Sequence, residues 1–265
     1  MATASPDLPD APRIVVLAPH LAELTYAAGA GDRLVATVAF SDFPGAATEL
    51  PVIGDAFRID LERLVATRPD VVLAWDGGTP KALMEEIAAL DIRVVALSAG
   101  TLADIGTNLR KIGALAGTKQ AAYAAADRFE ARLGTLRSDY AERASVRVYY
   151  QVADRPLFTI GGTHSLNDAI SLCGGENVFA AIDHPAPAVD IESVLGRDPQ
   201  VIVGGLHPLP AAGGLGALAA WLKWDGVAAV RAGHVYPLDA SLMGRATPRL
   251  LDGVARLCDL IDRAR

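Results

Sequence analysis

DLERLVATRPDVVL, residues 60–73, and DIESVLGRDPQVIV, residues 190–203, are two stretches of this sequence with one pattern. They align without a gap, and the identical positions include Asp60/Asp190, Glu62/Glu192 and Pro69/Pro199. In each stretch an aspartate can cap a short helix, a proline ends it, and a β-branched run predicts a buried strand. The repetition predicts two similar α/β lobes within one chain.

The sequence around both stretches alternates between short apolar runs and helical patterns. The predicted strands are 13–18, 34–40, 71–75, 94–97, 146–152, 201–203 and 235–237, and the predicted helices are 20–28, 60–65, 80–90, 165–172 and 248–264. Tyr26-Ala-Ala-Gly29 and Ser171-Leu-Cys-Gly174 each end a helix that follows an early strand. Such alternation predicts parallel sheets that are covered on both faces.

Residues 119–143 contain no proline and one glycine, and large apolar side chains recur there at helical spacing. This segment predicts one long helix that bridges the lobes. The predicted organisation is a disordered N-terminal tail at 1–12, an N-terminal lobe at 13–115, the bridging helix at 116–144 and a C-terminal lobe at 145–265. The polar, proline-rich tail has no apolar signal core, and we interpret it as what remains after a signal peptide was replaced by a start methionine.

The composition is that of a soluble globular protein, with 265 residues, 51% hydrophobic and 21% charged. A net charge of −7 without any basic run argues against nucleic acid as a partner. The sequence has no phosphate-binding loop, no dinucleotide-binding turn, no zinc-protease helix and no nucleophile elbow. We therefore do not expect an enzyme.

Aromatic residues follow several predicted strands. Phe40 and Phe43 flank Ser41-Asp42, Trp75 precedes Asp76-Gly-Gly78, and Phe158 precedes Thr159-Ile-Gly-Gly162. Ligands bind at strand ends in open parallel sheets, so these side chains line a pocket or else pack into the core or a lid. We expect backbone N–H groups of the glycine-rich loops to contact the ligand as well.

Two further residue types leave alternatives open. His20, His184 and His207 lie in predicted loops at strand ends, where they are either exposed loop histidines or converging metal ligands. Cys173 and Cys258 are either buried thiols of a cytosolic protein or a disulfide formed in an oxidising compartment.

Several short motifs occur together along residues 13–265. They are Glu23-Leu24, Ser41-Asp-Phe-Pro44, Asp60-Leu-Glu-Arg63, Arg68-Pro-Asp-Val-Val-Leu-Ala-Trp75 with Gly77-Gly78, Cys173-Gly-Gly-Glu-Asn177 and Ala246-Thr-Pro-Arg249. In this combination the chain resembles the helical-backbone substrate-binding proteins of ABC importers, which take up cobalamin, haem and siderophores. Ala74-Trp75 with Gly77-Gly78 is most similar to the cobalamin branch.

The resemblance implies an α/β fold of two Rossmann-like lobes joined by a single long rigid helix, with a ligand cleft between the lobes. It implies a monomeric periplasmic protein that captures a corrinoid, cobalamin or a precursor such as cobinamide, and performs no chemistry on it. The implied ligand-binding residues are Phe40, Trp75, Phe158, His20, Phe57, Asp76, His207, Leu242 and Arg245.

The resemblance also implies that Cys173 and Cys258 form a disulfide. It implies that Glu62 and Glu192, one in each lobe, dock onto arginines of the importer's permease at the inner membrane. The alternative for these glutamates is that each stabilises only the N-terminal turn of its own helix.

The chain departs from the cobalamin branch at three positions. Ala56, Ala186 and Leu242 stand where tryptophans are expected from the resemblance, which predicts a roomier and less aromatic pocket. A haem, a ferric siderophore or a metal would also suit a wide apolar cleft, with His20 or His207 as the iron ligand. An α/β enzyme with a cleft between its lobes is the remaining alternative.

Overall fold

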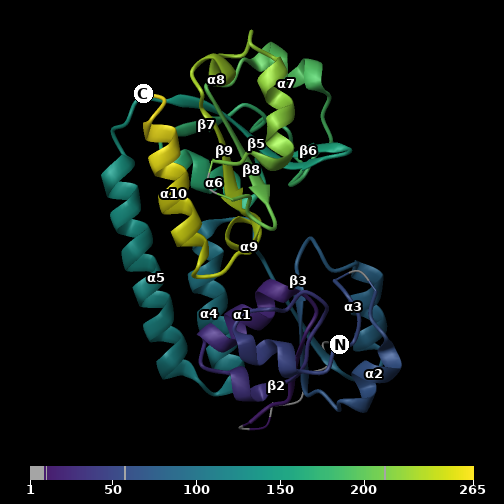
Figure 1. Cartoon of the computed structure of the whole chain (residues 1–265). Helices are drawn as coiled ribbons and strands as arrows, with labels where there is room; N and C mark the ends of the chain where they lie inside the picture. Colours follow the sequence, from purple (N-terminus) through teal and green to yellow (C-terminus); the bar gives the residue numbers. More distant parts are fainter. Residues whose placement is uncertain (1–8, 10, 57, 212) are drawn as a thin grey trace. The chain divides into compact units, whose positions relative to one another are not determined.

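The computed structural model describes residues 9, 11–56, 58–211 and 213–265, and the chain divides into two compact units (Figure 1). Unit 1 comprises the described residues up to Ala99 together with Ala103–Glu130, and unit 2 comprises Gly100–Leu102 and Ala131–Arg265. The chain therefore passes between the units on either side of Gly100–Leu102 and again within one long helix, between Glu130 and Ala131. The predicted lobe limits stay a prediction, and the predicted tail lies almost entirely outside the described residues.

Unit 1 is an α/β layer structure. Its elements are β1 (Ile14–Val16), α1 (Pro19–Ala27), η1 (Gly31–Arg33), β2 (Leu34–Ala36), η2 (Gly45–Glu49), α2 (Leu61–Ala66), β3 (Val71–Trp75), α3 (Lys81–Ala88), β4 (Arg93–Leu97), α4 (Leu102–Ala116) and the first half of α5 (Lys119–Tyr140). The four strands are parallel in the order β2-β1-β3-β4. Figure 1 shows α1 and α4 on one side of this sheet and α2 and α3 on the other.

Unit 2 continues from α5 with the same alternation. Its elements are β5 (Val146–Asp154), β6 (Leu157–Thr159), α6 (Ser165–Leu172), β7 (Gly175–Asn177), α7 (Ile191–Arg197), β8 (Val201–Leu206), η3 (Gly216–Lys223), α8 (Ala228–Arg231), β9 (Val235–Asp239), α9 (Ala240–Met243) and α10 (Leu250–Asp262). Strands β7, β5, β8 and β9 pair in parallel, and β6 pairs antiparallel with β5. The structure therefore confirms the prediction of two α/β lobes with parallel sheets.

The internal repeat is present in the structure. The parallel order β7-β5-β8-β9 in unit 2 corresponds to β2-β1-β3-β4 in unit 1. Asp60 and Asp190 both cap their helices, accepting from the N–H of the third residue on at 3.0 and 2.6 Å. Gly29 and Gly174 both follow a helix end with φ of +73° and +70°, a conformation that favours glycine. The repeated residues therefore build the same local structure twice.

The burial and the residue types of the strands agree with their positions in the parallel sheets. In β3 the first four residues are completely buried, as expected for a strand covered on both faces. Pro237, which lacks an N–H donor, lies in β9, the last strand in its sheet order, where a missing donor is tolerated.

Helices α4 and α5 are packed unusually closely in unit 1. A Cβ added to Gly113 of α4 would lie 2.2 Å from the Cβ of Ala122 in α5, so only glycine fits there. Arg110 of α4 adds ion pairs with Asp127, at 2.6 Å, and with Glu130. These contacts bind the first half of the long helix to unit 1.

A disulfide joins two helices of unit 2. Cys173 is the C-cap of α6, Cys258 lies in α10, and their Cα atoms are 4.7 Å apart. Both residues are fully buried. The disulfide that the resemblance implies is thus present.

Several predicted element limits are wrong by a few residues, among them those of one strand and of the long helix. The strand predicted at 34–40 ends at Ala36, because Thr37 pairs with Val52 in an isolated bridge and Phe40 turns the chain with φ +67°. The helix predicted at 119–143 ends at Tyr140. Helix α4 was not expected, since two glycines interrupt its pattern.

Candidate ligand-binding site

The predicted ligand residues of unit 1 lie at the carboxyl edge of its sheet. His20 is the second residue of α1, directly after β1, and Phe40 follows β2. Trp75 is the last residue of β3, and Asp76 follows it with an exposed side chain. Because β2, β1 and β3 are neighbours, the structure brings these loops together at one edge, where open parallel sheets bind ligands. Phe57 lies outside the described residues.

The Trp75 ring is held by its neighbours. The His20 ring meets it edge-on, with ring centroids 5.3 Å apart and planes at 84°. His20 is only 8% exposed, whereas Trp75 is half-buried. An edge-to-face contact of this kind stabilises the orientation of both rings. Trp75 can therefore present a fixed aromatic surface to a ligand.

The geometry of the turn after Trp75 accounts for the two glycines and the threonine that follow it. A Cβ on Gly78 would lie 1.9 Å from an indole carbon of Trp75, so the indole occupies the space that any other side chain would need. Gly77 has φ +84°, which favours glycine. Thr79, which is buried, accepts a hydrogen bond from the Trp75 N–H at 3.0 Å and donates its own N–H to the Trp75 carbonyl at 2.8 Å. Sequence reasoning missed Thr79, although a threonine closing a Trp-Asp-Gly-Gly turn is visible in the sequence.

Phe40 projects from a strained turn. Its side chain is 79% exposed, and φ of +67° is uncommon for a residue other than glycine. The loop is fixed on either side, since the Ala39 N–H donates to the Gly54 carbonyl and Thr37 Oγ1 donates to Ser41 Oγ at 2.7 Å. A large aromatic side chain held outward on an anchored, strained loop is typical of a binding surface.

The predicted residues of unit 2 also lie near the carboxyl ends of its strands. Phe158 of β6 pairs with Ala153, close to the end of β5, and His207 follows β8. Leu242 lies in α9, which begins directly after β9, and Arg245 follows that helix. Phe158, Leu242 and Arg245 are half-buried, and His207 is exposed. The structure thus places all four in the loops and short elements at one edge of this sheet.

The expected role of the glycine-rich loops is wrong at three positions. The N–H groups of Gly161 and Gly162 donate to the carbonyls of Pro185 and Ile182, and the Gly78 N–H donates to the Trp75 carbonyl. These three N–H groups are hydrogen-bonded to carbonyl groups of the protein itself. The same glycines serve close packing, because a Cβ on Gly161 would lie 2.0 Å from a backbone oxygen.

Glu62 and Glu192 occupy equivalent positions in the two units. Each is the second residue of a short helix, α2 or α7, and each side chain is exposed. Neither directly follows a strand, since each lies in the first turn of its helix. A favourable interaction with the first helical turn accounts for one carboxylate at each place, but the structure also leaves both accessible to a partner.

Two properties of the described residues bear on the alternatives. Nowhere among them do three or more His, Cys, Asp or Glu side chains gather in a group suited to a metal ion. In the same part of the chain, no helix combines the length and the apolar character needed to cross a membrane.

Two α/β units of matching strand order, with aromatic side chains at the carboxyl edges of both sheets, define a solute-binding protein of the two-lobed class. The sequence matches the family described as periplasmic binding protein over residues 14–242. The chain belongs to this family.

Individual relatives agree with that assignment. The chain is 34% identical over 248 residues to a vitamin B12-binding protein of Vibrio parahaemolyticus, covering 93% of this chain and 88% of that protein. Among solved structures, it is similar to the periplasmic vitamin B12-binding protein BtuF of Vibrio cholerae, with a TM-score of 0.88, 34% identity and coverage of 96% and 98%. A periplasmic haem-binding protein from Pseudomonas aeruginosa has a TM-score of 0.80 and 26% identity, with coverage of 94% and 92%.

Proposed function

We propose that this protein captures a corrinoid, cobalamin or a precursor such as cobinamide, in the periplasm and delivers it to the permease of an ABC importer. The observation that carries the proposal is the Trp75 site. An indole held by His20 and by the Gly77-Gly78 turn offers a rigid aromatic face at a sheet edge where ligands bind. The relatives named for vitamin B12 binding support the choice of a corrinoid.

In this proposal the protein binds the ligand through non-covalent contacts and does not change it chemically. Phe40 and Trp75 of unit 1 and Phe158 of unit 2 supply apolar surface, and Asp76, His207 and Arg245 supply polar groups for amides at the rim of a corrin ring. Leu242 and the small side chains at Ala56 and Ala186 leave more room than tryptophans would. This favours a site that accepts corrinoids with different lower ligands.

Delivery requires recognition by the permease. We propose that Glu62 and Glu192 make these contacts, because the same carboxylate is exposed at the same place of both units. A pair of equivalent contacts suits a partner with two-fold symmetry. Carboxylates meeting arginines fix the register of docking and contribute charge-assisted hydrogen bonds.

A binding titration tests the proposed ligand. Purified protein is titrated by calorimetry with cyanocobalamin, dicyanocobinamide, haemin and a ferric hydroxamate siderophore. We expect one corrinoid bound per chain, more tightly than the other two ligand classes. A haem-binding protein is the second candidate, because the P. aeruginosa relative is named for haem and His20 lies beside Trp75. Tighter binding of haemin, with a Soret band altered by a His20→Ala substitution, would establish that alternative instead.

A further inference from the structure

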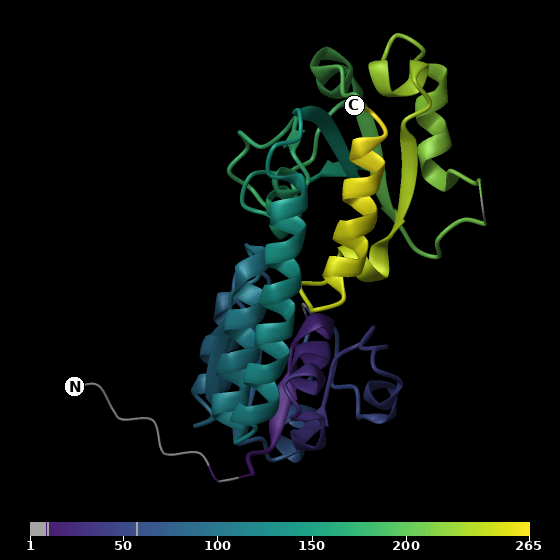
Figure 2. The same cartoon turned by 90° about the vertical axis from the view of Figure 1, so that its left-hand side faces the viewer.

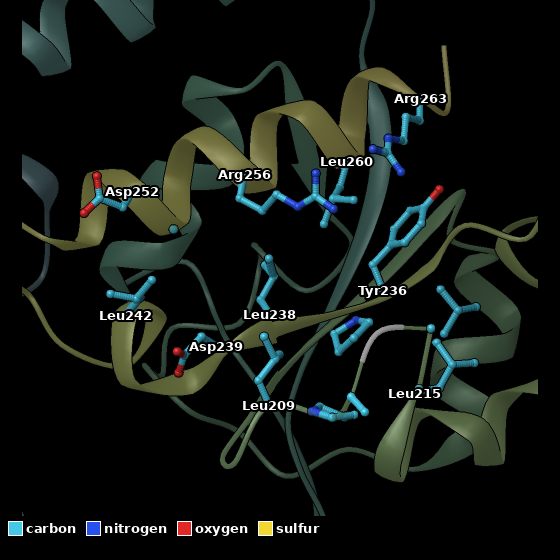
Figure 3. Close-up of a pocket in the computed structure, with 17 residues that line it drawn as sticks. Leu209, Leu215, Tyr236, Leu238, Asp239, Leu242, Asp252, Arg256, Leu260 and Arg263 are labelled. Atoms are coloured by element: carbon cyan, nitrogen blue, oxygen red, sulfur yellow. The ribbon is translucent and has the colours of Figure 1, made fainter.

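A second cavity lies within unit 2, along the outer side of β9. It has a volume of about 660 Å³, is open to solvent on one side, and is bordered by β9, α9, α10 and residues of the loop before η3 (Figure 3). Figure 2 shows α10 running beside β9. The volume lies within the range of cavities that hold small organic ligands.

Most of this cavity is distant from the proposed corrinoid site. It touches Leu242 and Asp239 at the carboxyl end of β9, but its lining continues back to Val235 and includes Tyr236, three residues from Asp239 along the strand. At the rise of an extended strand, this separation is about 10 Å. We call the cavity the α10 groove.

Two arginines border the α10 groove, one within α10 and one at its C-cap. Arg256 and Arg263 are seven residues apart, which places them on one face of the helix. In Figure 3 both side chains extend from α10 over the cavity, and that of Arg256 points along the helix toward Arg263. The Arg263 guanidinium carbon lies 5.9 Å from the centre of the Tyr236 ring. The groove therefore has a cationic rim at the end away from the corrinoid site.

No carboxylate neutralises these cations among the described residues, where neither arginine has an ion pair. Of the two acidic residues that line the groove, one is paired with another arginine and the other lies at the carboxyl end of β9, away from Tyr236 (Figure 3). Asp252 pairs with Arg132 at 2.7 Å, and Asp239 accepts the Ser241 N–H at 2.8 Å as the cap of α9. The end of the groove at Tyr236, where the two arginines lie, therefore favours an anion.

The floor of the groove is apolar. Leu238 and Leu260 are nearly fully buried beneath it, and Leu209, Leu215 and Leu242 line its sides. Covering such a surface with a hydrocarbon body removes apolar area from water. A free inorganic anion would leave this surface uncovered.

We propose that the α10 groove binds an amphiphilic anion, whose apolar body lies on the leucines and whose carboxylate or phosphate head is held by Arg256 and Arg263. Guanidinium groups bind both heads through paired charge-assisted hydrogen bonds. This inference does not rest on the proposed corrinoid function.

Calorimetry on the full chain tests the groove with defined probes. Dodecanoate and dodecyl phosphate, each below its critical micelle concentration, are compared with dodecyltrimethylammonium and with inorganic phosphate. We expect one anionic amphiphile bound per chain, at least 10-fold more tightly than the cationic amphiphile or phosphate alone. The tighter of the two anionic probes identifies the preferred head. Equal binding of the cationic amphiphile, or of inorganic phosphate, overturns the proposal.

Substitutions locate the binding. The double variant R256Q/R263Q should weaken the anionic amphiphile at least 10-fold, whereas R128Q, which removes an exposed arginine of α5, should have no effect. Circular dichroism verifies that each variant is folded. If the double variant does not fold, amphiphile binding is compared in the single variants R256Q and R263Q instead. Unchanged affinity in the arginine variants overturns the proposal.

The corrinoid site is the main competing location for an apolar probe. Trp75→Ala should leave amphiphile binding unchanged, and R256Q/R263Q should leave corrinoid affinity unchanged. Loss of amphiphile binding in Trp75→Ala overturns the α10 groove and leaves the corrinoid proposal intact. Failure of corrinoid binding in the wild type, with amphiphile binding that depends on the arginines, overturns only the proposed function.

Discussion

Breaking the Cys173–Cys258 disulfide should destabilise unit 2 and leave unit 1 unchanged. The bridge joins α6 to α10, and the loop that it closes lies entirely within unit 2. Reduction removes a constraint on the unfolded chain, while the buried apolar face of α10 still packs in the folded state. We therefore expect reduced unit 2 to fold, with lower stability.

The magnitude follows from the length of the loop. The cysteines are 85 residues apart in sequence. For a loop of this length, the chain-entropy relation gives about 4.6 kcal/mol at 25 °C, and residual structure in the unfolded chain lowers this figure. We expect a loss of about 3–5 kcal/mol in the free energy of unfolding of unit 2.

The three tryptophans allow the units to be followed separately. Trp75 lies in unit 1, and Trp221 and Trp224 lie in unit 2. In Trp75→Phe, tryptophan fluorescence reports unit 2 alone, and in a Trp221→Phe/Trp224→Phe variant it reports unit 1 alone. Each variant is unfolded in urea with and without reductant, and mass analysis after alkylation confirms complete reduction.

The control is a Cys173→Ala/Cys258→Ala variant, whose unfolding should not respond to reductant. Two results would refute the reasoning. If fully reduced unit 2 unfolds at the same urea concentration as the oxidised form, loop entropy does not stabilise it. If unit 1 loses as much stability as unit 2, the units unfold as one body and the effect is not confined to the closed loop.

Three other predictions concern the ligand, the partner and pH. Trp75→Ala should weaken corrinoid binding by about 1–3 kcal/mol in calorimetry, as for loss of a large aromatic anchor, and unchanged affinity would remove Trp75 from the site. Reversing Glu62 and Glu192 to Lys should abolish transport or stimulation of the permease ATPase, with ligand affinity within a few-fold; normal transport contradicts the docking role. Burial lowers the pKa of His164 to about 4, so its neutral ring, which accepts the Leu166 N–H at 3.0 Å, stabilises the fold fully above pH 6.5. About 1–3 kcal/mol should be lost as the pH falls from 6.5 to 4, and His164→Asn should abolish this part of the pH dependence of urea unfolding.

The repeated stretches made much of the fold predictable. A capping aspartate, a proline and a β-branched run each have a local physical meaning, and those meanings do not depend on distant residues. Both copies form the predicted helix and strand, and both strands pair with the first strand of their own sheet. Consistent local signals of this kind are reliable because tertiary packing does not oppose them.

Helix α4 shows where local signals fail. Gly106 and Gly113 weaken its helical pattern, because glycine is a poor helix former. In the structure they allow α5 to approach, since a Cβ at Gly106 would lie 2.5 Å from the carboxylate of Glu130 and one at Gly113 would overlap Ala122. The reason for these glycines is a tertiary contact, which the sequence of α4 alone does not contain.

The site was predictable by position and not by detail. Trp75 and Phe40 follow or end strands as the sequence predicts, and their role in binding stays a prediction. The turn that fixes Trp75 depends on where its indole points, which the sequence does not give. The same limit applies to the glycine-rich loops, whose donors look available in sequence and are hydrogen-bonded to Ile182 and Pro185 in the structure. The sequence did not indicate a binding site at Arg256 and Arg263, because two arginines at helical spacing usually belong to an ordinary solvent-exposed face.

The features that repeat and those that do not suggest a division of roles. The capped helices with Glu62 and Glu192 are the same in both units, as a partner with two-fold symmetry requires. The carboxyl edges differ, since unit 1 presents Trp75 against His20 while unit 2 presents Phe158 on β6, an antiparallel strand with no counterpart in unit 1. Exchanging Glu62 and Glu192 for other residues should therefore affect delivery, and changes at the carboxyl edges should affect capture.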